Sequence, residues 1–133
     1  MRGRILVALV LSIACAGGHG VPARLPIGTW GGADVGLIVS ADSVHVHIGC
    51  TRGEIEGRVP VEASGAFTTM GLHNVDAFPV DLGIFHPARY DGRLHGDDRL
   101  TLDVTLLDTG QRLGPAEAFL GREPNLRICP ICR

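Results

Sequence analysis

A two-residue hydrophobic period across residues 35–48 constrains the fold of this chain more than any other feature. Six apolar residues recur at every second position on the two sides of a four-residue loop: Val35, Leu37, Val39, Val44, Val46 and Ile48. Such alternation is typical of half-buried strands. A loop of this length predicts an antiparallel hairpin that sets Val39 against Val44 and Val35 against Ile48, with all six side chains on one face.

The alternation resumes in residues 53–62, which we expect to form a further strand. After a short turn, the chain is predicted to return with Val61 opposite Phe67 and Val59 opposite Thr69. Both pairings would extend the antiparallel order begun by the first hairpin.

From Met70 to Pro87 the two-residue period is lost, although the segment is rich in apolar residues. We expect an irregular loop here, which either plugs one end of the sheet or forms a lid in contact with a ligand.

The period returns in a predicted hairpin that pairs Leu94 with Leu102 and Arg93 with Asp103, so that the core and charge patterns agree. A final strand is expected over residues 112–120, interrupted by Pro115. The count is then about seven or eight short strands, as in small all-β proteins. The sequence therefore predicts an all-β antiparallel meander over residues 27–121, closed into a barrel or a sandwich, followed by a tail over residues 122–133.

Residues 1–16 have the pattern of an export signal, with two arginines, an apolar run and small residues before the expected cut. The apolar run is too short to span a membrane as a helix. Cys15 is an alternative site of lipid attachment, as in bacterial lipoproteins. We therefore expect a periplasmic or extracellular protein, or a lipid-anchored one, with residues 17–26 as a linker.

The charge of the chain argues against a nucleic-acid partner. The leader holds two of the 12 basic residues and none of the 14 acidic ones, so its removal shifts the formal net charge from −2 to −4. A domain without a basic excess has nothing to attract phosphate backbones.

The cysteines fit an oxidising compartment. Cys50 follows a predicted strand and Cys129 lies near the C-terminus, so a disulfide between them would hold the tail against the sheet. Cys132 is the competing partner, and the pair Cys129 and Cys132 has the two-residue spacing of a redox disulfide or half a zinc site. Neither a helix nor a second cysteine pair accompanies it, which favours the structural bridge.

His45 and His47 are the best candidates for a metal site. Residues two apart on a strand point to the same face, which would present two imidazoles to one ion such as zinc. If Ile48 paired with Ile55, Glu56 would lie opposite His47 and complete a set of three ligands. The alternative is a solvated polar face, and His73, His86 and His95 are more distant candidates.

Gly28-Thr29-Trp30 resembles the opening Gly-x-Trp of lipocalin-type and avidin-type barrels, the calycin group. That resemblance implies a binding barrel whose floor is closed by the tryptophan, and it brings no ligand-binding residues with it. The longer pattern, which adds Gly31-Gly32, Gly53 to Gly57 and His86 to Tyr90, resembles small exported bacterial proteins of uncharacterised type.

No catalytic set is evident in the sequence, so the first hypothesis is a non-enzymatic exported barrel or sandwich that binds a small apolar ligand or a partner protein. The second is a metal-binding protein or metal-dependent hydrolase that uses His45 and His47. The third is an inhibitor or an envelope-associated structural protein.

Overall fold

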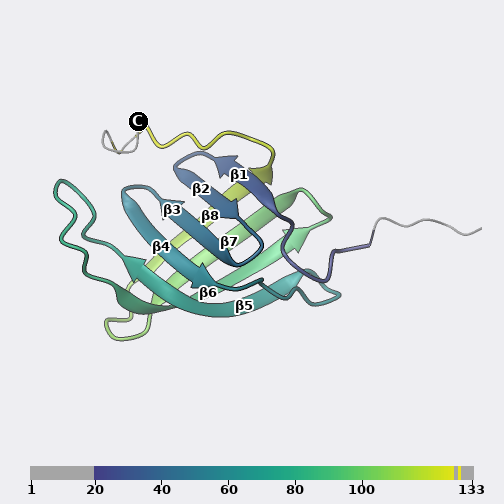
Figure 1. Ribbon diagram of the computed structural model, residues 1–133, viewed down its shortest axis with the longest axis horizontal. Helices are drawn as coiled ribbons and strands as arrows, with labels where there is room; N and C mark the ends of the chain where they lie inside the picture. The colour runs from purple at the N-terminus through teal and green to yellow at the C-terminus, as the bar shows by residue number, and fades with distance from the viewer. Residues whose placement is uncertain (1–19, 128, 130–133) are drawn as a thin grey trace, which may run out of the picture.

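The computed structural model describes residues 20–127 and 129, which form a closed antiparallel barrel of eight strands (Figure 1). Each strand pairs with its neighbours in sequence, and β8 closes the barrel against β1. The strands are β1 (Gly28–Gly32), β2 (Val35–Val39), β3 (Ser43–Ile48), β4 (Thr51–Glu56), β5 (Ala66–Asn74), β6 (His86–His95), β7 (Arg99–Leu106) and β8 (Arg112–Leu120). The all-β meander is confirmed, as a barrel. The predicted leader, Cys15 and Cys132 lie outside the described residues.

The first predicted hairpin is confirmed in its register. In β2 and β3, Val39 pairs with Val44, and Val35 pairs with Ile48. The six alternating apolar residues of the two strands point inward, whereas His45 and His47 lie on the outer face of the barrel.

The segment after β4 differs from the prediction, because the strand ends at Glu56 and residues 57–65 form a loop. Val59 and Val61 are buried, but they face neither Thr69 nor Phe67 across a ladder. Instead, the amide of Leu25 donates to the carbonyl of Val59, and the amide of Val61 donates to Ala23. Their alternation was therefore a true sign of extended backbone, but the segment bonds to the chain that enters β1.

β5 runs on to Asn74, so the irregular segment is shorter than the predicted Met70 to Pro87. The reason is an inverted pattern, in which His73 points into the barrel while Met70 and Leu72 are exposed on its outer face. A strand with apolar residues outside and polar residues inside does not show the usual signal. The true connection to β6 covers residues 75–85.

The hairpin of β6 and β7 has the predicted faces but different partners. Leu94 pairs with Leu100 rather than Leu102, and Arg93 pairs with Thr101 rather than Asp103. The three-residue turn lies at residues 96–98, one residue earlier than the predicted 97–99, and this moves each partner by two positions. Because side chains alternate with a period of two, this shift leaves every side chain on its expected face.

The interior is filled by side chains from all eight strands. Trp30 is fully buried, and its indole Nε1 donates to the carbonyl of Pro26 at 3.1 Å. Leu25, which precedes the predicted domain, also belongs to this core. The arrangement is a packed barrel interior, as expected for one of this strand number.

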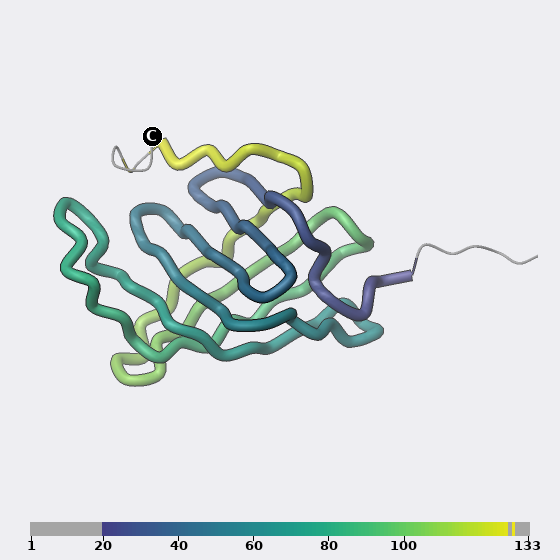
Figure 2. Tube along the Cα trace, in the orientation of Figure 1, coloured from purple at the N-terminus to yellow at the C-terminus, as the bar shows by residue number. Residues whose placement is uncertain are grey.

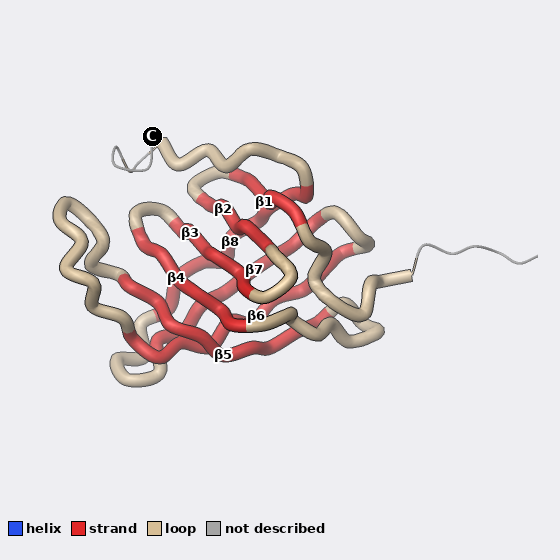
Figure 3. The backbone as a smooth tube through the Cα atoms, in the orientation of Figure 1, coloured by secondary structure: helices blue, strands red, loops and turns tan. Residues whose placement is uncertain are grey.

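One end of the barrel gathers the features that matter for function. An antiparallel meander places alternate connections at opposite ends, so the turns after β1, β3 and β7 share an end with loop 75–85 (Figure 2). This loop projects beyond the strands, as Figure 3 shows. The C-terminal tail runs over β1 and β2, where Asn125 bonds Gly32 and Asp34, and Pro124 occupies the space that a side chain at Gly36 would need.

Candidate functional site

The inside of the barrel offers little support for an internal ligand site. Five inward-facing residues that would line such a site are all at most 2% exposed: Val35, Leu37, Val46, Leu102 and Val104. They pack in one cluster with side chains from the opposite strands. The ends and the outer face of the barrel are the remaining places for a binding site.

A polar group inside the barrel surrounds His73. Its Nδ1 lies 2.9 Å from the Tyr90 hydroxyl, and its Nε2 lies 2.7 Å from the hydroxyl of Thr51. Gly53 makes room for this group, because a Cβ there would come within 2.0 Å of the Tyr90 oxygen. Burial lowers the pKa of His73 to about 4 and raises the pKa of Tyr90, so the group is neutral at physiological pH.

His45 and His47 meet on the outer face of β3. Their Nε2 atoms lie 2.8 Å apart, and Nδ1 of His45 donates to the carboxylate of Glu54 on β4. The side chains of His45 and Glu54 are 32% and 44% exposed. Burial is the main cause that lowers the pKa of His47, with His45 and Arg52 adding to it and Glu54 opposing it. The sequence thus identified the histidine pair.

The predicted carboxylate was wrong, because the register of β3 and β4 differs from the one assumed. Ile48 pairs with Thr51 rather than Ile55, and Glu56 lies opposite Ser43, well along the strand from His47. A two-residue turn at Gly49 and Cys50 joins the strands, and it brings Glu54 opposite His45 instead.

The other histidines have partners of their own. His86 pairs with Asp108 at 2.7 Å, His95 contacts the hydroxyl of Thr101, and His73 points inward. Across the described part of the chain, no group of three or more histidine, cysteine, aspartate or glutamate residues is placed to hold a metal ion. Metal binding by His45 and His47 stays a prediction.

Loop 75–85 was not recognised in sequence as a structured element, yet it has a regular pattern. Every second residue from 78 to 84 is apolar and between 44% and 70% exposed: Phe78, Val80, Leu82 and Ile84. Met70 and Leu72 are also exposed, on the outer face of β5. Contiguous exposed apolar residues on a soluble domain mark an interaction site.

The loop is held in place by Asp81. Its carboxylate accepts hydrogen bonds from Arg52 Nε at 2.7 Å, from Asn74 Nδ2 at 2.8 Å and from the amide of Gly83 at 2.8 Å. The guanidinium of Arg52 also lies over the ring of Phe85, 4.7 Å from its centroid. Asp81 thus bonds to residues of β4 and β5, whereas the side chains of Phe78, Val80, Leu82 and Ile84 are exposed.

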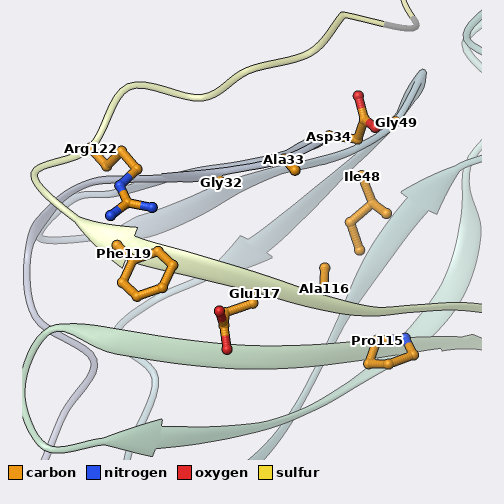
Figure 4. A pocket seen from close by; sticks show the side chains of 10 residues that line it. All are labelled: Gly32, Ala33, Asp34, Ile48, Gly49, Pro115, Ala116, Glu117, Phe119 and Arg122. Atoms are coloured by element: carbon orange, nitrogen blue, oxygen red, sulfur yellow. The ribbon is translucent and has the colours of Figure 1, made fainter.

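An open pocket of about 530 Å³ lies at the same end of the barrel, between the β1–β2 turn, the β3–β4 turn and β8 (Figure 4). Ile48 and Ala116 supply apolar lining, and Arg122 stacks on Phe119 at 4.1 Å from the ring centroid. One carboxylate oxygen of Asp34 is buried there without a hydrogen-bond partner. The volume of this pocket is in the range of small-molecule sites.

Both residues of the predicted disulfide lie within the described part of the chain. Cys50 lies in the β3–β4 turn at the loop end of the barrel, and Cys129 is fully buried. The amide of Cys129 donates to Leu126 in the tail. The bridge between them stays a prediction, with Cys132 as the competing partner.

Comparison with protein-family models, with curated proteins and with solved structures gave no match to this chain. The eight-stranded barrel is established by the structure alone. The resemblance to calycins is limited to the opening Gly-x-Trp motif. No helix able to cross a membrane occurs among residues 20–127 and 129.

Proposed function

We propose that this chain is an exported, non-enzymatic barrel that binds a partner protein through loop 75–85. The observation that carries the proposal is the exposure of four alternating apolar side chains on a loop that is anchored through Asp81. Export rests on the leader pattern in the sequence.

The anchoring matters because it makes the loop ready to bind. A flexible loop loses conformational entropy when it docks, at roughly 0.5–1.5 kcal/mol for each side chain that is immobilised. Here Asp81 and Phe85 already hold the loop against Arg52, which leaves Phe78 and Leu82 turned away from the barrel. Docking then buries apolar surface without first having to order the backbone.

The chemistry of this surface favours a protein rather than a lipid bilayer. Loop 75–85 contains Asp76 and Asp81 and no basic residue, and Glu54 and Glu56 line a shallow pocket beside Met70 and Leu72. Anionic membranes attract basic segments and repel acidic ones. The expected partner presents an apolar groove with basic residues at its rim.

A small apolar ligand is the second candidate, and the pocket at the barrel end supports it. That pocket is open and contains Arg122 and Asp34 beside its apolar lining, so it fits a ligand with a polar end. An inhibitory or envelope-associated role would use the same outer surface, and the identity of the partner would separate these roles.

The test replaces Phe78, Val80, Leu82 and Ile84 with serine in the exported chain of the native cell. Because all four side chains are exposed, thermal stability should change little. The native protein should run as a complex in size-exclusion chromatography of the exported fraction, and the variant as a monomer.

The matched control replaces Ile27 and Ile38, two equally exposed apolar residues outside the loop, with serine. This control should keep the complex. The proposed binding surface would be refuted if all three proteins ran as complexes of equal size. It would also be refuted if both variants lost the complex to the same extent.

A further inference from the structure

We infer that His45 and His47 form a two-imidazole chelate for a divalent transition metal, with Glu54 as a positioning residue. The inference is independent of loop 75–85. It starts from the convergence of the two Nε2 atoms, which lie 2.8 Å apart on the outer face of β3. The rings meet edge to face, with centroids 4.7 Å apart.

This spacing is close to what a metal requires. Zinc binds imidazole nitrogen at about 2.0–2.1 Å, so two nitrogens in adjacent positions are about 2.9 Å apart at a right angle and about 3.3 Å apart at a tetrahedral angle. The observed separation therefore needs only a small opening of the two rings. A metal at that point would take the place of the hydrogen that Nε2 of His47 now shares with Nε2 of His45. That hydrogen would move to Nδ1 of His47, which is buried and has no hydrogen-bond partner among residues 20–127 and 129.

Glu54 fixes the chemical form of His45. Its carboxylate accepts a hydrogen bond from Nδ1 of His45, so the hydrogen of the neutral ring is held on Nδ1 and the lone pair is on Nε2. A carboxylate on the far nitrogen of a ligating histidine orients the ring and increases its basicity. Glu54 thus acts through His45, in place of the direct ligand role predicted for Glu56.

The surrounding charges leave both rings available. Arg52 is the cation nearest to His47 along β4, and its guanidinium is paired with Asp81 at 2.7 Å.

The site would hold a metal through two protein ligands, because the described residues supply no third one. Water would fill the other positions. Imidazole favours zinc, copper and nickel over magnesium or calcium, and affinity within this series is greatest for copper. The inferred site is therefore open and selective for late transition metals.

The test is calorimetric titration of the mature chain with zinc and, separately, with copper, followed by electron paramagnetic resonance of the copper-bound protein. In the sequence, His19 follows two glycines, and a chain cut after Ala16 would bind copper through its amino terminus. Every protein in the series therefore carries His19→Ala. One metal should bind per chain, and the copper spectrum should show coupling to two nitrogens.

Single changes His45→Ala and His47→Ala should each weaken binding at least tenfold and remove one coupled nitrogen. Glu54→Gln should keep the coupling of the copper spectrum to both nitrogens. It should weaken metal binding by about 10–100-fold, as expected for a residue that bonds to a metal ligand and not to the metal. The matched control is His86→Ala, because His86 has a similar carboxylate partner in Asp108. Circular dichroism of each variant checks that the barrel is intact.

Equal affinity in the parent and in a protein with both His45 and His47 replaced would overturn the inference. So would loss of affinity in His86→Ala equal to that in His45→Ala. If Glu54→Gln bound metal as tightly as the parent, the positioning role would be refuted.

Discussion

Nδ1 of His73 lies 2.9 Å from the hydroxyl of Tyr90 inside the barrel, and this hydroxyl donates to the carbonyl of Leu72 at 2.8 Å. A hydroxyl has one hydrogen, so His73 must be the donor to Tyr90. Nε2 of the neutral ring then accepts from the hydroxyl of Thr51, 2.7 Å away, when that hydroxyl turns its one hydrogen from the carbonyl of Ile48 to the ring. The buried ring thus satisfies both of its nitrogens without a charge.

We predict that this burial makes stability depend on pH. The pKa of His73 is about 4 in the folded protein and about 6.5 when unfolded, so the unfolded chain binds more protons between these values. The free energy of unfolding should therefore fall as pH falls from about 6.5 to about 4, by up to about 3 kcal/mol. Above pH 6.5, His73 should make no contribution to the change of the free energy of unfolding with pH.

The direct measurement is the imidazole titration of His73 by nuclear magnetic resonance. A midpoint near 4 is expected for His73. A midpoint near 6.5 would contradict the account, whatever the stability curve shows. His47, whose pKa is also lowered, acts in the same direction on stability.

The second prediction concerns the anchor of loop 75–85. Asp81→Ala removes the acceptor for Arg52, Asn74 and the Gly83 amide, so hydrogen exchange at Gly83 should accelerate while the barrel melts at nearly the same temperature. Asp97→Ala, in the β6–β7 turn, is the control and should leave Gly83 protected.

The anchor should also respond to acid. The hydrogen bond from the Gly83 backbone, together with Arg52, holds the pKa of Asp81 below its usual value. Protection at Gly83 should thus be present at neutral pH and disappear as pH falls through that lowered pKa. Protection that is the same in Asp81→Ala and in the parent would refute the anchoring role.

The third prediction is the disulfide between Cys50 and Cys129. Peptide mapping of the mature protein without reduction should recover these two cysteines joined, with fragmentation inside the tail to separate Cys129 from Cys132. Cys50→Ala should then cost roughly 4 kcal/mol in the chain-entropy account, and Cys132→Ala little. A bridge from Cys129 to Cys132 would defeat this prediction.

The sequence was most informative where apolar residues face inward and turns are short. The register of β2 and β3 was predictable because Val39 and Val44 flank a loop of fixed length. Between β6 and β7 the faces were predictable but the partners were not, because a shift of two residues preserves the pattern that pairs Leu94 with either Leu100 or Leu102.

The candidate sites were likewise predictable within one strand and unpredictable where they depend on a turn. His45 and His47 could be placed together because they lie on one strand, but the partner carboxylate depended on the turn at residues 49–50. The exposed loop was harder still, because its alternation has the apolar residues on the solvent side. Only the bonds of Asp81 to Arg52 and Gly83 reveal that the loop has a defined conformation.

The claim that loop 75–85 binds a partner protein is tested most directly by photo-crosslinking in the native cell. A photoreactive amino acid is placed at Leu82, which is 70% exposed, or at Asp97 in the β6–β7 turn at the opposite end of the barrel. The account predicts one discrete protein adduct from position 82, none from position 97, and loss of the adduct when Phe78 and Val80 are serine. Absence of any protein adduct at position 82, or crosslinking to lipid alone, would contradict it.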